Sequence, residues 1–258
     1  MTSSTSVLFK RDGPIATITL NRPSRRNAID AEMSAALRAA VSELEADDDL
    51  LIGILRGAGP AFSAGMDLAA FERGEAEDIL FGPGHLGGFV SRPRRKPVIA
   101  SVHGPALAGG FELVLACDLV VAAEEAVFGL PEAKIGLVAG AGGALRLGQR
   151  LPQAIANELL LTGGTIDAHR AASLGLVNRV VPAGELEDTA RGLARVIASN
   201  APLAIEAGLA LTAASRNVGS DAIWQENDRH LRALLSSDDA AEGARAFAEK
   251  RAPVWRGR

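Results

Sequence analysis

The sequence of 258 residues contains one cysteine, no tyrosine and only 4% aromatic residues. The single cysteine, Cys117, rules out an intramolecular disulfide framework, and its apolar neighbours predict a buried thiol in a protein of a reducing compartment. Basic residues are also scarce, because 27 Lys and Arg stand against 31 Asp and Glu and give a formal net charge of −4. We therefore expect no nucleic-acid partner, and any anionic ligand has to be met by local basic groups.

Long hydrophobic runs are absent as well. The longest apolar stretch, near residues 113–123, is interrupted by Asp118, and residues 1–13 lack the apolar centre of a signal peptide. These two features predict a soluble, cytoplasmic protein with no membrane partner. Hydrophobic residues are nevertheless abundant, at 48% of the chain, which is enough to bury the core of one large domain.

The periodicity of apolar residues predicts an α/β core. Residues 16–20 alternate as a half-buried strand, and after Asp30, which is placed to cap a helix, apolar residues recur every three or four positions. Short β-rich runs follow at residues 51–57, 97–104 and 118–123, each ended by glycine or a polar residue. Because strands alternate with helices, we expect a mainly parallel sheet.

The last third of the chain reads as mostly helical, with one late strand at residues 176–181. Its final helix is expected to begin at Ser236, because Asp239 follows at the spacing of a capping box. We expect residues 1–199 to form the core that carries the site, and residues 200–258 to form a C-terminal helical region.

Two glutamates stand out because their neighbours are apolar. Glu112 lies in "ALAGGFELVLA" and Glu132 in "FGLPEAKIG". An ionised carboxylate is costly to bury without partners, so each is either a structural ion-pair residue or is kept for chemistry. Gly109 is placed at a helix start, and Gly65 precedes Met66 in "AFSAGMDL". Such glycines can serve turns and helix packing, but two such loops can also direct two N–H donors at one oxyanion.

Several separated motifs resemble those of one family. The segments "NRPSRRNAID", "AFSAGMDLAAF", "VHGPALAGGFELVLACDLVVA", "FGLPEAKIGLVAGAGGALRL" and "RAFAEKRAPVW" look like the successive motifs of the crotonase superfamily, the enoyl-CoA hydratases and isomerases. They occur in the family's order and cover nearly the whole chain. The resemblance implies an α/β fold, a crotonase-like spiral of ββα units followed by a helical C-terminal oligomerisation region, and an acyl-CoA thioester as the substrate.

The resemblance also implies roles for individual residues. The amides of Met66 and Gly109 would form the oxyanion hole, while Glu112 and Glu132 would hold the water that adds to a trans-2-enoyl-CoA. This hydro-lyase chemistry needs no metal and no cofactor beyond the coenzyme A of the substrate. The positions implied to bind coenzyme A are Arg25, Arg26, Ala28, Ala64, Asp67, Leu68, Phe247 and Lys250.

Phe247 and Lys250 are three residues apart, so we expect them to share one helical face. In relatives the matching pair reaches the coenzyme A bound by a neighbouring subunit. The resemblance therefore implies a homotrimer or a dimer of trimers.

Other activities remain open at this stage. Isomerases, hydrolases, decarboxylases and dehalogenases use the same fold, and "GGFELVLA" and "EKRAPVWRGR" are similar to the carnitinyl-CoA dehydratase branch. A non-catalytic binding protein of the same fold is disfavoured because both glutamates are retained. A serine hydrolase is disfavoured because Ser63 lacks the G-x-S-x-G elbow, and neither dinucleotide nor P-loop glycine motifs occur.

Overall fold

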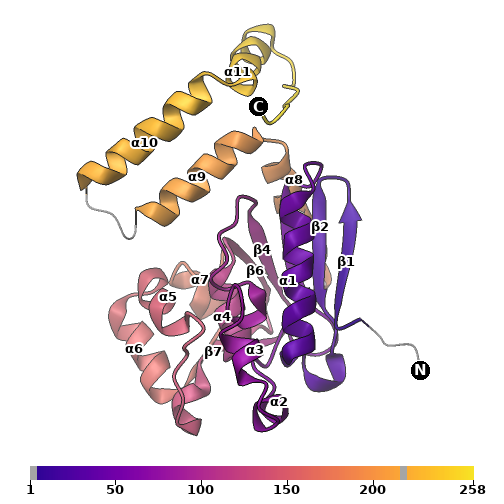
Figure 1. The fold of residues 1–258 in the computed structure, drawn as a ribbon, viewed down its shortest axis with the longest axis vertical. Helices are drawn as coiled ribbons and strands as arrows, with labels where there is room; N and C mark the ends of the chain where they lie inside the picture. The colour runs from indigo at the N-terminus through magenta and orange to yellow at the C-terminus, as the bar shows by residue number, and fades with distance from the viewer. Residues whose placement is uncertain (1–4, 216–219) are drawn as a thin grey trace.

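The computed structural model describes residues 5–215 and 220–258, and it is built around a six-stranded sheet (Figure 1). The strand order is β1-β2-β3-β4-β6-β9, and every pair is parallel except β1 with β2. The strands are β1 (Val7–Asp12), β2 (Ile15–Leu20), β3 (Ile52–Gly57), β4 (Val98–Val102), β6 (Leu119–Ala123) and β9 (Arg179–Val181). The sequence predicted all of them except β1, an edge strand that is exposed over most of its length and so lacks an apolar pattern.

A second sheet of three short strands explains how the chain winds. It consists of β5 (Pro105–Leu107), β7 (Val127–Gly129) and β8 (Thr165–Asp167). In one turn β4 leads to β5 and then to α4 (Gly109–Ala116), and in the next β6 leads to β7 and then to the short helix η3 (Pro131–Ile135). Single parallel bridges, Ile29 with Met66 and Ser63 with Ala106, extend this arrangement to the two earlier turns. The chain therefore forms a spiral of strand–strand–helix units, and the predicted fold class is confirmed.

Both faces of the large sheet are covered, so β2 is buried on both faces and not half-buried, as its alternating residues 16–20 had predicted. In β4 the side chains of Val98, Ala100 and Val102 belong to the main core with α1 (Ala31–Ala46). Ile99, between them, belongs to a smaller core with α8 (Leu186–Ala198) on the opposite face. Figure 1 shows these two helices on opposite sides of the sheet.

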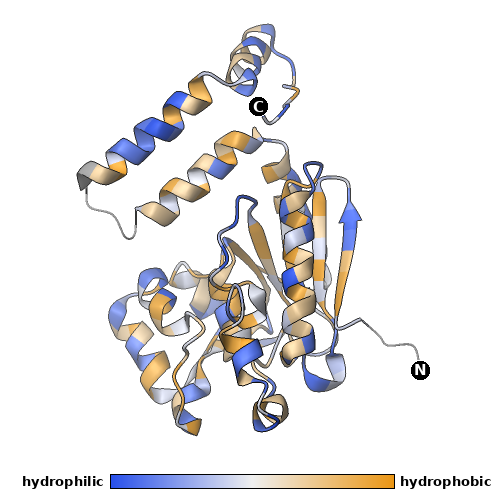
Figure 2. Ribbon diagram, viewed as in Figure 1, coloured by the Kyte–Doolittle hydropathy of each residue, from blue (hydrophilic) through white to orange (hydrophobic). Residues whose placement is uncertain are grey.

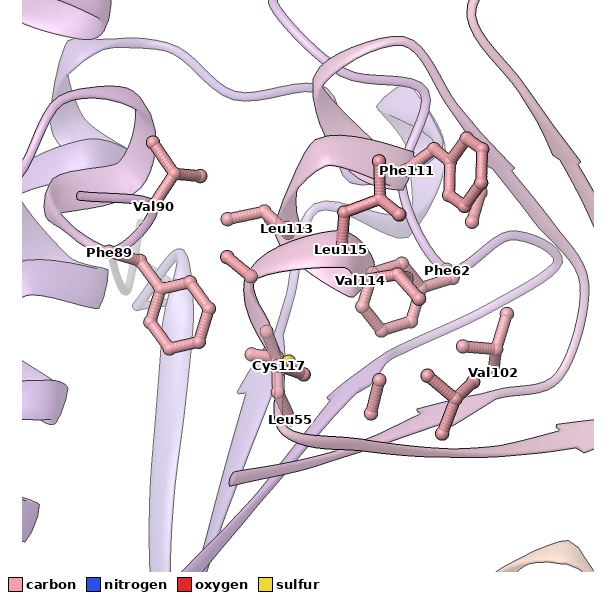
Figure 3. Packing of buried hydrophobic residues seen from close by; sticks show 14 of the residues in the cluster. Leu55, Phe62, Phe89, Val90, Val102, Phe111, Leu113, Val114, Leu115 and Cys117 are labelled. Atoms are coloured by element: carbon pink, nitrogen blue, oxygen red, sulfur yellow. The ribbon is translucent and has the colours of Figure 1, made fainter. Parts of the chain in front are cut away.

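The main core surrounds α4 and includes the cysteine (Figure 3). The Phe111 and Phe128 rings pack with their centroids 5.4 Å apart, and the guanidinium carbon of Arg94 lies 4.4 Å from the centroid of the Phe89 ring. Cys117 is completely buried, as the sequence predicted, and burial raises the pKa of its thiol to about 12.

The C-terminal helices extend away from the sheet (Figure 1). Besides α1, α4 and α8, the α-helices are α2 (Leu68–Glu72), α3 (Ala76–Leu80), α5 (Gly143–Arg150), α6 (Gln153–Thr162), α7 (Ala168–Ser173), α9 (Pro202–Ala214), α10 (Ser220–Leu235) and α11 (Asp238–Glu249). The helix α9 is apolar along most of its length in Figure 2, yet Ala207 is its only buried residue. The chain thus presents an apolar helix that its own core does not cover.

No single helix within residues 5–215 and 220–258 has the length and apolarity to cross a membrane. Only a bent pair meets both criteria, residues 183–198 with residues 202–214, and its two arms are inclined at 105°.

Two expectations for the last helix were wrong. Its N-cap is Ser237 instead of Ser236, because the Ser237 hydroxyl accepts the Ala240 amide at 3.1 Å. The Asp239 carboxylate is withdrawn from capping, since it accepts the amides of Arg256 and Gly257 at 2.7 and 3.0 Å and holds the C-terminal segment.

Candidate active site

The loop between β3 and α2 presents the Met66 amide. On one side of Met66 the Gly65 carbonyl accepts the Ile29 amide at 2.8 Å, and on the other side the Asp67 amide donates to the Ile29 carbonyl at 2.9 Å. In a parallel pairing of this kind the Met66 amide itself is directed away from Ile29. Among the hydrogen bonds of the described residues, none has the Met66 amide as donor.

The second amide, that of Gly109, lies next to this loop. Gly109 is the first residue of α4, where a helix N–H has no intrahelical acceptor, and it follows Ala108, whose backbone has a φ of 51°. A Cβ atom placed on Gly65 would lie 2.6 Å from the Gly109 nitrogen, and one placed on Gly109 would lie 3.4 Å from the Met66 nitrogen. The absence of side chains at both glycines therefore allows the two amides to approach each other.

Glu112 is one turn further along α4, and only 3% of its surface is exposed. Its Oε1 atom accepts the Gly143 amide at 2.8 Å. Burial raises the pKa of this carboxyl to about 7; the Gly143 and Ala141 amides oppose the rise, and the nearby charge of Glu132 adds to it. Glu112 is thus held in place by a backbone donor while its ionised form is disfavoured.

Glu132 lies in η3, on the following turn of the spiral, and is 9% exposed. Its Oε2 atom is buried and has no hydrogen-bond partner among the residues that the structure describes. Burial also raises the pKa of this carboxyl. The structure therefore brings the two carboxylates into one electrostatic environment, in which the charge of Arg146 opposes part of the rise in the pKa of Glu112.

The spiral explains why Met66, Gly109 and Glu132 meet. Met66, Gly109 and Glu132 each follow a short-strand position and lie at or near the beginning of a helix, in three consecutive turns. Because successive turns stack in register through the parallel pairing of the short strands, equivalent points of each turn lie side by side. Positions 66, 109 and 132 are thus distant in sequence and close in space.

Five of the positions considered for coenzyme A lie around the start of the second turn. Arg25 and Arg26 are exposed, Ala28 and Ala64 are half-buried, and the Ala64 amide donates to the Arg26 carbonyl at 2.9 Å. The side chain of Leu68 is 52% exposed.

Asp67 differs from these neighbours because its carboxylate is already engaged. It accepts the amides of Ala69 and Ala70 at the start of α2 and forms an ion pair of 3.1 Å with Arg22. Burial disfavours its charged form, but the hydrogen bonds and the charge of Arg22 outweigh burial and lower the pKa of Asp67. Any contact between Asp67 and a ligand would have to use its backbone.

The last two positions are remote from this cluster within the chain. Phe247 is 87% exposed on α11, which Figure 1 shows at the far end of the C-terminal helices. Lys250 follows the end of α11 with a φ of 53°, so the expectation that both residues share one helical face was wrong. The reason is that Lys250 is itself the left-handed residue that ends the helix, so it lies outside α11.

Sequence reasoning missed three residues that build the site. Asn27 is fully buried, and its amide donates to the carbonyls of Ala58, Ala61 and Phe62 at 2.8 to 3.1 Å. Arg22 and Gly143 were missed as well, because their partners Asp67 and Glu112 lie far from them in the sequence.

Ser63 has a structural function in this loop. Its hydroxyl is fully buried, donates to the Asn27 carbonyl at 2.8 Å and accepts the Gly65 amide at 3.1 Å. An engaged, inaccessible hydroxyl of this kind does not favour a serine nucleophile. Among the described residues there is also no group of three His, Cys, Asp or Glu side chains able to hold a metal ion.

A spiral of strand–strand–helix units that buries two neighbouring carboxylates beside two apposed amides defines a protein of the crotonase fold class. The chain belongs to the enoyl-CoA hydratase/isomerase family, whose model matches residues 10–258.

Curated proteins and solved structures are similar to this chain over nearly its full length. A carnitinyl-CoA dehydratase of Salmonella typhi is 47% identical, over 99% of this chain and 100% of that protein. An enoyl-CoA hydratase structure from Mycobacterium marinum is 48% identical with a TM-score of 0.95, over 99% of this chain and 100% of that chain. An enoyl-CoA hydratase structure from Mycobacterium tuberculosis is 47% identical, with a TM-score of 0.95 and the same coverage.

Proposed function

We propose that the protein catalyses the reversible hydration of a trans-2-enoyl-CoA to a 3-hydroxyacyl-CoA. The observation that supports this most directly is the pair of buried glutamates, Glu112 and Glu132, whose pKa values are both raised by burial. A carboxyl with a pKa near the working pH can both accept and donate a proton, which is what addition of water to a double bond requires.

The two amides supply the electrostatic part of this mechanism. The Met66 and Gly109 amides donate to the thioester oxygen, and this polarisation makes Cβ of the unsaturated acyl group electrophilic. Negative charge develops on that oxygen as water adds, and preorganised donors stabilise such charge without having to reorient.

The carboxylates move the protons. Glu112 removes a proton from the water that attacks Cβ, and Glu132 delivers a proton to Cα, so that H and OH add across the double bond; both roles reverse in dehydration. The pair therefore enters each turnover with one proton, held by Glu132. Exchange with solvent restores this distribution after release of the product.

Coenzyme A takes part as a portion of the substrate, and no separate cofactor or metal is needed. In this proposal Arg25 and Arg26, both exposed beside the Ala64 loop, bind its phosphates, while Ala28, Ala64, Leu68 and the Asp67 backbone contact the rest of coenzyme A. Arginine suits such phosphates because its guanidinium forms charge-assisted, bidentate hydrogen bonds.

The active form in this proposal is a homotrimer or a dimer of trimers. It is supported by the apolar helix α9 and by exposed Trp224, Leu235 and Phe247 on α10 and α11. Apolar surface of this extent on one region is typical of an interface. Phe247 and Lys250 then complete the cofactor site of a neighbouring subunit.

The proposal is tested with crotonyl-CoA and the variants Glu112→Gln and Glu132→Gln. Glutamine keeps the shape of each side chain but accepts no proton, so we expect turnover to fall by about 10²–10⁴-fold in each variant. Affinity for a saturated acyl-CoA, measured by calorimetry, should persist. Two variants that hydrate as fast as the parent would contradict the assignment.

A second candidate is dehydration of a carnitinyl-type thioester, favoured by the 47% identity to carnitinyl-CoA dehydratases over the full chain. The same four groups would serve, and only the acyl end of the substrate differs. A panel of thioesters with and without a quaternary ammonium distinguishes the two candidates. A third, double-bond isomerisation, predicts conversion of 3-enoyl-CoA in the Glu112→Gln variant, where one carboxylate remains.

A further inference from the structure

Arg22 is the centre of a charge cluster that the proposed chemistry does not use. Its Nη2 atom lies 2.9 Å from Oδ2 of Asp30 and its Nη1 atom lies 3.1 Å from Oδ2 of Asp67. The same Nη1 also donates to the Ala28 carbonyl. The arginine side chain is only 22% exposed, and the two aspartate side chains are 12% and 11% exposed.

The two aspartates cap different helices. Oδ1 of Asp30 accepts the Met33 amide at the start of α1, and Oδ1 of Asp67 accepts the Ala69 amide at the start of α2. Each therefore offers one oxygen to a helix and the other to Arg22. Arg22 ties the beginnings of two successive turns of the spiral together.

The two aspartates adjoin the Met66 loop differently, because Asp67 belongs to the loop itself, whereas Asp30 follows Ile29, whose backbone is bonded to the loop. Asp67 is the residue after Met66. Its amide donates to the Ile29 carbonyl, and this is one of the two hydrogen bonds with Ile29 that set the direction of the Met66 N–H. On the other side, Ser63 and Asn27 hold the Gly65 end of the loop. The Met66 peptide is thus fixed at both ends, by Ser63 through Gly65 and by Arg22 through Asp67.

We infer that Arg22 and Asp67 form a positioning pair that holds the Met66 amide at the distance and angle required to donate to the thioester oxygen. This inference rests on the proposed hydration and goes beyond it, because neither residue touches the reacting atoms. Misplacement of a catalytic group by about 1 Å can cost 10²-fold in rate, so loss of this hold should appear in turnover.

The test compares Asp67→Asn with the matched control Asp30→Asn. Both variants keep the oxygen that caps a helix, and both remove one carboxylate charge from the same arginine. We expect Asp67→Asn to lower kcat for crotonyl-CoA by about 10- to 100-fold with KM changed less than about threefold. Asp30→Asn should change kcat less than about threefold, although both variants should lower the melting temperature.

A spectroscopic measurement reports the amide directly. The ¹³C=O stretching band of bound butyryl-CoA, which has no double bond to hydrate, should shift to lower frequency on the parent protein because two donors polarise it. The shift should shrink with Asp67→Asn and persist with Asp30→Asn.

Three results would overturn the inference: equal effects of the two variants on kcat, an Asp67→Asn effect confined to KM, or an undiminished carbonyl shift in Asp67→Asn. Failure of the proposed function is distinguished from these, because then the parent protein itself would neither hydrate crotonyl-CoA nor shift the carbonyl band.

Discussion

At the scale of single residues, Glu112 is subject to two opposing effects. The surrounding apolar core disfavours its charge, while the Gly143 amide donates a 2.8 Å hydrogen bond that favours it. Burial prevails, so the pKa rises to about 7. A group in this condition can exchange a proton readily near neutral pH, at some cost to the stability of the fold.

The first prediction concerns the pH dependence of activity. Glu112 must be ionised to act as a base, and its pKa is raised to about 7, so kcat/KM for hydration should fall as the pH drops from 8 to 5. The rate should be followed by loss of the conjugated-thioester absorbance in buffers of constant ionic strength. A profile that is level across this range would contradict the role of Glu112 as the base.

The second prediction concerns stability. The folded pKa of about 7 lies above the ordinary value of 4.5, so the folded state binds more protons than the unfolded state between these values. The contribution of Glu112 to the free energy of unfolding therefore falls as the pH rises from 4.5 to about 7. Glu112→Gln removes the charge, so it should raise the free energy of unfolding at pH 8 by up to about 3 kcal/mol while lowering turnover by about 10²–10⁴-fold.

Chemical denaturation of the variant and the parent at pH 4.5 and pH 8 measures this gain. The difference in the free energy of unfolding between the two proteins should be largest at pH 8. A variant less stable than the parent at pH 8 would refute the prediction.

At the scale of elements, the helix α5 links packing to the site. A Cβ atom on Gly143, its first residue, would lie 2.9 Å from Oε1 of Glu112 and 2.8 Å from Cβ of Ala139. Neither neighbour can withdraw freely, because Glu112 and Ala139 are both buried. The start of this helix has room for glycine alone.

We predict that Gly143→Ala displaces Glu112, lowers kcat by at least about tenfold and costs about 1–3 kcal/mol of stability through overpacking. Gly148→Ala is the control on the same helix, because its Cβ would have its nearest neighbour at an ordinary 3.6 Å. The Gly148→Ala variant should keep the parent's kcat, and its free energy of unfolding should rise by up to about 1 kcal/mol. Kinetics and thermal melting of the two variants provide the comparison, and equal kcat values would refute a positioning role for Gly143.

The elements of the large sheet were predictable because burial on one or both faces leaves a pattern in the sequence. β4 and β6 are continuous apolar runs, and the periodicity of α1 marks the one face that it buries. The small sheet was missed, since strands of three residues such as β5 and β7 are too short to show any period. Lys250 was misplaced because a helix end depends on the backbone of one residue, which spacing does not reveal.

For the site, the sequence indicated which residue types carry chemistry but not what holds them. Glu112 and Glu132 stood out because a charge among apolar neighbours is unusual. Arg22 and Asn27 act through partners 30 to 45 positions away, such as Asp67 and Ala58, and no local pattern encodes contacts of that range. Gly143 is needed only because Glu112 approaches from another turn of the spiral.

At the scale of the whole molecule, the C-terminal helices are the part least explained by a single chain. The helix α9 has one buried residue, and Phe247 is 87% exposed. We predict that sedimentation of the active protein gives the mass of a trimer or a dimer of trimers. An active monomer would exclude a cofactor site shared between subunits.

The shared site makes a further prediction for Lys250. Lys250→Gly removes the cation while suiting the left-handed backbone, where φ is 53°. It should weaken binding of acyl-CoA by about 1.5–3 kcal/mol, the worth of a hydrogen bond to a charged group, and leave kcat at saturation nearly intact. Calorimetric titration measures the affinity, and an unchanged value would remove Lys250 from the site.

The position of Cys117 has a consequence for watching this protein unfold. The chain has one thiol, which is fully buried in the main core and has a pKa raised to about 12. A thiol reagent can therefore modify the native protein only while the core around α4 is open, and the labelling rate reports how often that happens. Because the chain has a single thiol, each molecule is modified once at most, and mass spectrometry would show the modified and the unmodified protein as two peaks. Labelling of Cys117 therefore measures the opening of the core in the natural sequence, with no engineered cysteine.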